Sequence, residues 1–108
     1  MVRTMKVETA GVGIALLVIG TLHGLAADAG RGVAIAERWC SGCHVVSQGQ
    51  KYGTTDAPPF SEIADREDLD PGKVALFLLL PHPPMAEMNL SRTDAADLAV
   101  YIATQKGK

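Results

Sequence analysis

The sequence has few cysteines, no excess of positive charge and no pattern typical of strands. Only two of its 108 residues are cysteines, so a zinc site built from four cysteines is excluded. The formal net charge is −2 and no basic stripe runs along the chain, which argues against nucleic acid as a partner. Internal repeats, low-complexity tracts and sustained apolar–polar alternation are also missing. These absences leave one small all-α domain as the prediction.

The first 27 residues differ in kind from the rest of the chain. Arg3 and Lys6 give a basic start, and residues 9–27 contain no Asp, Glu, Lys or Arg. The centre of this stretch is strongly apolar, and small residues follow it. This pattern is typical of a secretory signal peptide. We therefore expect a leader over residues 1–27 and a domain over residues 28–108, with the protein in the periplasm.

The end of the leader offers two cleavage patterns of the small-x-small type. Gly24-Leu25-Ala26 is the first, and Ala27-Asp28-Ala29 is the second. An uncleaved membrane anchor is the alternative, because the charge-free stretch is 19 residues long and close to the length that spans a bilayer. We favour cleavage, since glycines and threonines interrupt the apolar run.

The most informative feature is the run Cys40-Ser41-Gly42-Cys43-His44. Two cysteines at i and i+3 lie on one face of a helical turn, so both sulfurs can form thioethers to the two vinyl groups of one haem. The histidine behind them can ligate the iron through an imidazole nitrogen. This pentapeptide is the attachment signature of a c-type haem. It predicts one covalent haem c, bound through Cys40 and Cys43.

Other interpretations of the two cysteines explain less. No βαβ pattern surrounds them, which argues against a thiol–disulfide redox pair. A zinc site needs further ligands, and His82 lies alone in a proline-rich turn. Two buried structural cysteines would leave the adjacent histidine to chance. A covalent haem also suits an exported chain of about 80 residues, because short helices can pack around its large apolar ring.

Four helical segments are expected: 28–43, 60–64, 70–80 and 91–102, with a loop over 45–59. Asp70-Pro71 supplies an N-cap followed by proline at the first helical position. The run that follows is apolar on all sides and ends before Pro81, so we expect its helix to be buried on most faces. Ser91 and Asp94 resemble a capping box. Gly32 marks either a frayed helix start or a place where another helix approaches closely.

After the leader, the chain resembles a class I cytochrome c. The resemblance is carried, in order, by the haem motif and by residues 57–60 (Ala-Pro-Pro-Phe), 81–85 (Pro-His-Pro-Pro-Met) and 98–102 (Leu-Ala-Val-Tyr-Ile). It implies a small all-α cytochrome c fold, with several short helices and loops wrapped around one covalent haem. It also implies that the first and last helices cross, with Gly32 and Ala36 against Tyr101.

The resemblance implies a methionine sulfur as the second axial ligand of the iron, after His44. Met85 lies in the usual position, behind two prolines. Met88 and His82 are the alternatives, although Met88 is better explained as a core-filling side chain and His82 as a turn residue. Ala86 departs from the family pattern, in which a proline more often follows the methionine. That departure weakens the expectation of a rigid loop more than the assignment of the ligand.

The family also implies contacts around the axial histidine. Its ring donates the other N–H to a proline carbonyl in the loop after the motif. Pro58 matches best here, and Pro59 is the alternative. Tyr52 and Phe60 are expected to shield the haem ring, and Trp39 to pack beside the first cysteine.

Two filled axial positions leave no place for substrate, so we expect a one-electron carrier and no enzyme. Redox protein partners, weakly bound at an exposed haem edge, would serve as donor and acceptor to a monomer. One alternative is a membrane-tethered haem c subunit of a dehydrogenase or oxidase, which an uncleaved leader would favour. Another is a haem sensor or peroxidase with a labile Met85, for which His82 is the obvious acid–base group.

Overall fold

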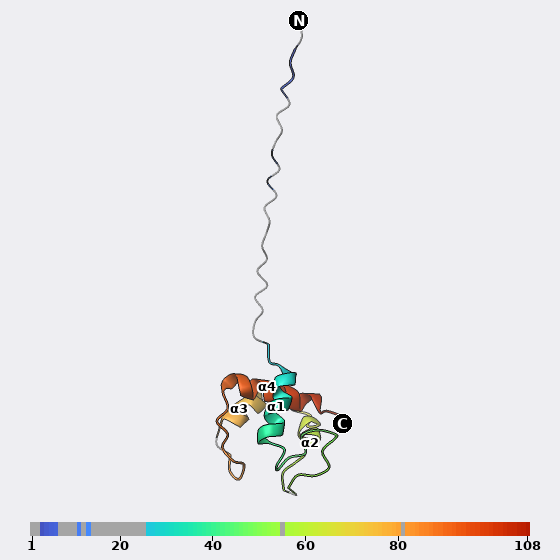
Figure 1. The fold of residues 1–108 in the computed structure, drawn as a ribbon, viewed down its shortest axis with the longest axis vertical. Helices are drawn as coiled ribbons and strands as arrows, with labels where there is room; N and C mark the ends of the chain where they lie inside the picture. The colour runs from blue at the N-terminus through green and yellow to red at the C-terminus, as the bar shows by residue number, and fades with distance from the viewer. Residues whose placement is uncertain (1–2, 7–10, 12, 14–25, 55, 81) are drawn as a thin grey trace.

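Four α-helices form the described part of the chain, and the all-α prediction is confirmed (Figure 1). This computed structural model describes residues 3–6, 11, 13, 26–54, 56–80 and 82–108, where no strand occurs. The helices are α1 (Ala29–Trp39), α2 (Phe60–Ala64), α3 (Pro71–Leu79) and α4 (Arg92–Thr104). No helix within those ranges is long and apolar enough to cross a membrane. Most of the predicted leader lies outside the described residues.

The helix starts follow from the capping residues in the sequence. Asp28 accepts hydrogen bonds from two backbone N–H groups in the first turn of α1. Asp70 caps α3, with Pro71 as its first residue. Ser91 and Asp94 form a reciprocal capping box at α4, each side chain 3.0 Å from the other residue's backbone nitrogen. Each bond satisfies a donor that the helix itself leaves without a partner, and the predicted starts are confirmed.

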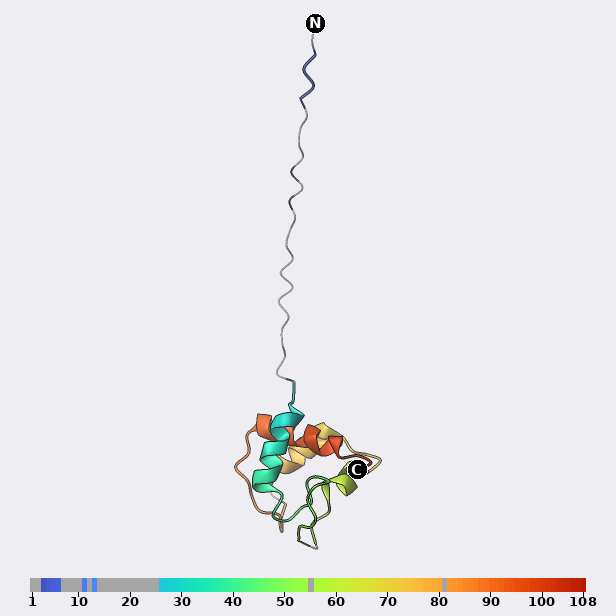
Figure 2. The same ribbon diagram turned by 45° about the vertical axis from the view of Figure 1, so that its right-hand side comes forward.

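The crossing of α1 and α4 organises the domain (Figures 1 and 2). A Cβ atom on Gly32 would lie 2.6 Å from the Cβ of Tyr101 and closer still to the carbonyl oxygen of Asp97. Only glycine fits there, so Gly32 marks a close helix approach as expected. Ala36, one turn later, is fully buried in the same core.

The core cluster lies around this crossing and extends to the loop after the haem motif. Its buried members are Ala36, Cys40, Val46, Phe60, Leu98, Tyr101 and Ile102. The Tyr101 hydroxyl donates a hydrogen bond to the Val46 carbonyl oxygen at 2.6 Å. This buried bond ties α4 to the loop across 55 residues of sequence. The last helix thereby helps to fix the loop that carries the candidate site.

The expectation that α3 is buried on most faces is wrong, because none of its residues is buried. Val74 and Leu78 pack against the core cluster, while Leu76 is 58% exposed and Phe77 is 54% exposed. The helix packs on α4, and no other described helix makes comparable contact with it. We call Leu76, Phe77, Leu79 and Leu80 the α3 apolar surface; all four are exposed.

Candidate functional site

The haem motif forms a compact turn at the end of α1. The backbone N–H groups of Cys40 and Ser41 both donate to the Ala36 carbonyl, at 2.9 and 3.0 Å. Those of Cys43 and His44 donate to the Cys40 carbonyl, at 3.1 and 2.8 Å. These bonds end the regular helix at Trp39, four residues before the predicted end at residue 43. The turn holds both thiols and the histidine in one short segment.

The two thiols have different surroundings. Cys40 is buried in the core cluster, Cys43 is exposed, and neither forms a disulfide. Burial raises the pKa of the Cys40 thiol to about 11, because a low-dielectric environment disfavours the thiolate. Before any covalent attachment, the Cys40 sulfur is therefore a protonated thiol at neutral pH.

The His44 ring is oriented by the Pro58 carbonyl. Its Nδ1 lies 2.6 Å from that oxygen, and since a carbonyl only accepts, Nδ1 carries the proton. In the neutral ring, Nε2 is then unprotonated and able to bind a metal ion. The Pro59 carbonyl accepts the Ile63 N–H instead, at 3.1 Å, in the first turn of α2. Phe60 is buried beside His44, with ring centroids 5.5 Å apart.

Gln50 connects several backbone groups around the motif, and sequence reasoning missed it. Its Oε1 accepts the Val46 N–H at 3.0 Å. Its Nε2 lies 2.8 Å from the carbonyl oxygens of Ser41 and His44, and 3.2 Å from that of Tyr52. One side chain thus links the residues before, at and after the axial histidine. A glutamine in a polar loop carries no sequence signal for such a role.

A second contact brings the loop back onto the motif at Gly53 and Thr54. The Thr54 N–H donates to the Cys43 carbonyl at 2.9 Å. A Cβ on Gly53 would lie 2.7 Å from the Cys43 carbonyl carbon and 3.0 Å from that of His44. The backbone of residue 53 therefore passes against the Cys43–His44 peptide, where only glycine fits.

The candidate distal ligands lie together in a small pocket of about 180 Å³ after α3. The His82 Nε2 is 3.0 Å from the Met85 sulfur, and its Nδ1 is 2.7 Å from the Leu80 carbonyl. The His82 ring lies on Phe77, with centroids 3.8 Å apart. Met88 also lines the pocket and packs against the core cluster, the role expected for it.

His44 and Met85 belong to separate clusters in this structure. No hydrogen bond or ring contact between them occurs among the described residues. Residues 45–54 and 82–90 lie on opposite sides of the motif end of α1 in both views (Figures 1 and 2). The described residues also contain no group of three or more His, Cys, Asp or Glu side chains suited to a metal ion.

The residues present fit a haem c. Two free thiols stand at i and i+3, His44 has an available Nε2, and Met85 offers a thioether. The α3 apolar surface, next to the Met85 pocket, is the kind of surface that a porphyrin ring would cover. Such a donor set, with one imidazole and one thioether beside two thiols, is typical of c-type haem sites.

Two aromatic residues near the motif are exposed. Tyr52 is 81% exposed, and its role in shielding a haem ring stays a prediction. Trp39 is 49% exposed, and the Arg38 guanidinium lies 5.1 Å from the centroid of its ring.

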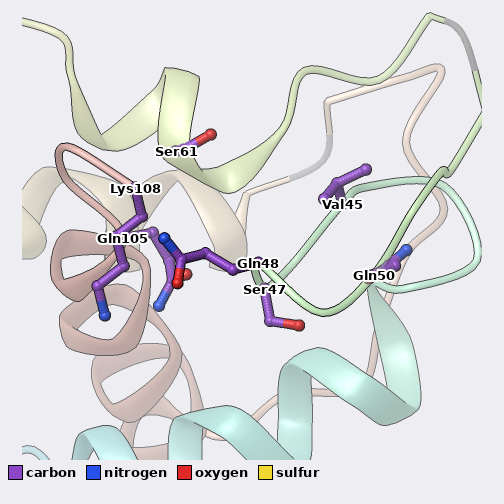
Figure 3. A pocket seen from close by; sticks show the side chains of 7 residues that line it. All are labelled: Val45, Ser47, Gln48, Gln50, Ser61, Gln105 and Lys108. Carbon is purple, nitrogen blue, oxygen red and sulfur yellow. The ribbon is translucent and has the colours of Figure 1, made fainter.

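A larger pocket, of about 380 Å³, has neither cysteine in its lining (Figure 3). It is lined by Val45, Ser47, Gln48, Gln50, Ser61, Gln105 and Lys108. These residues come from the loop after the motif, from α2 and from the C-terminal end. The pocket contains none of the predicted site residues, and its polar lining offers no thiol, imidazole or thioether.

One curated relative matches the chain closely. The chain is 51% identical over 80 residues to cytochrome c-552 of Bradyrhizobium diazoefficiens, a match that covers 74% of this chain and 77% of that protein. No protein-family model matches the chain. No solved structure is significantly similar to it.

Proposed function

The chain belongs to the mono-haem cytochrome c family. We propose that its haem has His/Met axial ligation and that it carries single electrons between periplasmic or membrane redox proteins. Family membership makes it a haem c electron carrier with redox protein partners, rather than an enzyme. The axial ligands, the compartment and the identity of the partners are the parts that we propose.

The observation that carries the proposal is the bond between His44 Nδ1 and the Pro58 carbonyl, 2.6 Å long. It fixes both the tautomer and the plane of the imidazole, so Nε2 is held ready as a ligand. Cys40 and Cys43 would anchor the cofactor through two thioethers from the same turn. When bound, the haem supplies the iron that cycles between Fe(II) and Fe(III).

Met85 is the proposed distal ligand. Met85 lines the pocket beside α3, and Met88, which also lines it, packs against the core cluster as well. A thioether favours the reduced, less charged iron, and an apolar pocket adds to this by excluding water. The α3 apolar surface would provide that exclusion on the Met85 side.

Spectra of the mature protein test the ligation. The chain is expressed with its leader in a host that matures c-type cytochromes, and haem that resists acid–acetone extraction reports the thioethers. The weak near-infrared sulfur-to-iron band of the oxidised protein should disappear in Met85→Ala. Met88→Ala is the matched control and should keep the band.

Other outcomes would redirect the assignment. Loss of the band in Met88→Ala alone would move the ligand to Met88. A wild-type protein with covalent haem but no sulfur band would point to His82 or to an open iron. Carbon monoxide binding by the reduced native protein would contradict filled axial positions and favour a sensor or peroxidase.

The leader is proposed to direct export to the periplasm and to be cleaved. Cell fractionation and the mass of the purified protein test this. A mature mass that still contains residues 1–26 would support the membrane-tethered subunit instead.

A further inference from the structure

Asp97 is a buried carboxylate at the start of α1. The residue is 1% exposed, and its Oδ1 accepts the backbone N–H of Asp28 at 2.7 Å. Its Oδ2 is buried and accepts no hydrogen bond from the described residues. The nearest cation is Arg31, whose Nε lies 3.5 Å from Oδ2 and whose side chain is 63% exposed. A buried carboxylate is costly unless its acceptor positions are filled, so Asp97 has an open position beside the backbone nitrogen of residue 28.

We propose that leader cleavage places the new α-ammonium group on Ala27 or Asp28, where it binds the Asp97 carboxylate. An ammonium group has three N–H donors and a full positive charge, whereas the peptide nitrogen of Asp28 has one donor and no charge. It can therefore fill the open position at Oδ2 and neutralise the buried charge. The inference rests on the proposed export of the chain.

The geometry allows this contact whether the mature chain starts at Ala27 or at Asp28. If the chain begins at Asp28, the ammonium nitrogen is the atom that already lies 2.7 Å from Oδ1. If it begins at Ala27, the ammonium is one backbone unit away, less than about 3.8 Å from that nitrogen. Cleavage is a hydrolysis by an export signal peptidase. Water supplies OH to the carbonyl carbon and H to the nitrogen, which takes a further proton near neutral pH.

The structure also favours the first of the two cleavage patterns, Gly24-Leu25-Ala26, over the second. Cleavage after Ala29 would remove Asp28, and with it the cap whose side chain binds the N–H groups of Gly30 and Arg31 at 2.8 and 3.2 Å. It would also remove the backbone donor to Asp97. Cleavage after Ala26 or Ala27 keeps all three bonds.

Four charged groups belong to the parts of α1 and α4 that meet near the proposed ammonium site. Arg31 and the Asp28 carboxylate belong to the start of α1, and Asp97 belongs to α4. Asp94 lies one turn earlier on α4; its pKa is lowered mainly by hydrogen bonds with Ser91 and, to a smaller extent, by Arg31. Carboxylates outnumber the single guanidinium, so an added cation is favoured here even though a helix N-terminus alone disfavours one.

The first test is the intact mass of the purified haem protein, made from the full chain. A start at Ala27 or Asp28 with a free amine is expected. Any other start, or a blocked amine, overturns the inference. Haem attachment is read separately, so covalent haem with a different start would leave the proposed function standing. A chain without covalent haem would instead contradict the proposed function.

The second test is the titration of that unmodified amine, followed by NMR through the ¹³C chemical shifts of the first residue in isotope-labelled protein. In the wild-type protein its pKa should lie at least one unit above that of the same amine in a short peptide of the same N-terminal sequence, because Asp97 stabilises the charged form. Asp97→Asn should remove most of this shift, and Asp94→Asn, the matched control, should keep most of it. A wild-type amine that titrates like the peptide overturns the inference without any variant.

Discussion

Replacing Gln50 by alanine tests how the chain holds its axial histidine. The substitution removes the Oε1 acceptor of Val46 and the Nε2 donor shared by the carbonyls of Ser41 and His44. These three bonds are partly buried, and each is worth about 0.5–1.5 kcal/mol net. The fourth bond, to Tyr52, is exposed and adds little. We expect the free energy of unfolding to fall by about 2–4 kcal/mol.

Gln48→Ala is the matched control. Gln48 has the same side chain two residues earlier, is exposed, and makes no side-chain hydrogen bond within the described ranges. Its replacement should change the free energy of unfolding by less than about 0.5 kcal/mol. Denaturant unfolding of the two haem-containing variants provides the comparison.

A second readout separates a local role from a purely structural one. Because Gln50 contacts the His44 carbonyl, its loss should alter the imidazole orientation, seen as changed paramagnetic shifts of the axial histidine in the oxidised protein. The reasoning is refuted if Gln50→Ala matches Gln48→Ala in stability and leaves those shifts unchanged.

Three further predictions concern packing and pH. Gly32→Ala should destabilise the protein by about 1–3 kcal/mol in denaturant, since no Cβ fits against α4; Gly49→Ala, in open space, should cost less than about 0.5 kcal/mol. Tyr101→Phe should cost about 1–2 kcal/mol, because the buried Val46 carbonyl loses its donor. Burial, and then the charge of Glu37, raise the pKa of Tyr101 above its ordinary value near 10.0. The stability that the neutral Tyr101 hydroxyl contributes is present below pH 10 and is lost as the pH rises through the folded-state pKa. The free energy of unfolding should therefore fall more steeply above pH 10 in the wild type than in Tyr101→Phe. Equal slopes in alkaline unfolding would contradict that assignment.

Features set by local chemistry could be predicted from the sequence. The caps Asp28, Asp70 and Ser91 begin their helices because a side-chain oxygen meets free N–H groups within three residues. The contact of His44 with Pro58 is predicted from the family resemblance, and the structure has it at 2.6 Å. In each case the partners are close in sequence or follow a known pattern.

Features that depend on the whole arrangement of the chain could not be predicted from the sequence. The exposure of α3 follows from which elements are present to cover it, and a run of seven apolar residues carries no such information. The contacts of Gln50 depend on the path of the loop, which folds three carbonyls around one amide. The open oxygen of Asp97 arises because α4 meets the chain 69 residues earlier, at Asp28.

The same exposure of α3 connects folding with the cofactor. The core cluster lies around α1 and α4, and Leu76 and Phe77 stay more than half exposed, although the His82 ring lies against Phe77. Covering the rest of each side chain would stabilise the fold by about 1 kcal/mol per residue, and a porphyrin ring beside the Met85 pocket would cover part of the α3 apolar surface. On the proposed function, the exposed surface would be a binding face of the mature protein rather than a defect of packing. Because that stabilisation requires the ring, thioether attachment at Cys40 and Cys43 would keep it in place through every redox cycle, which a haem held by axial ligands alone would not ensure.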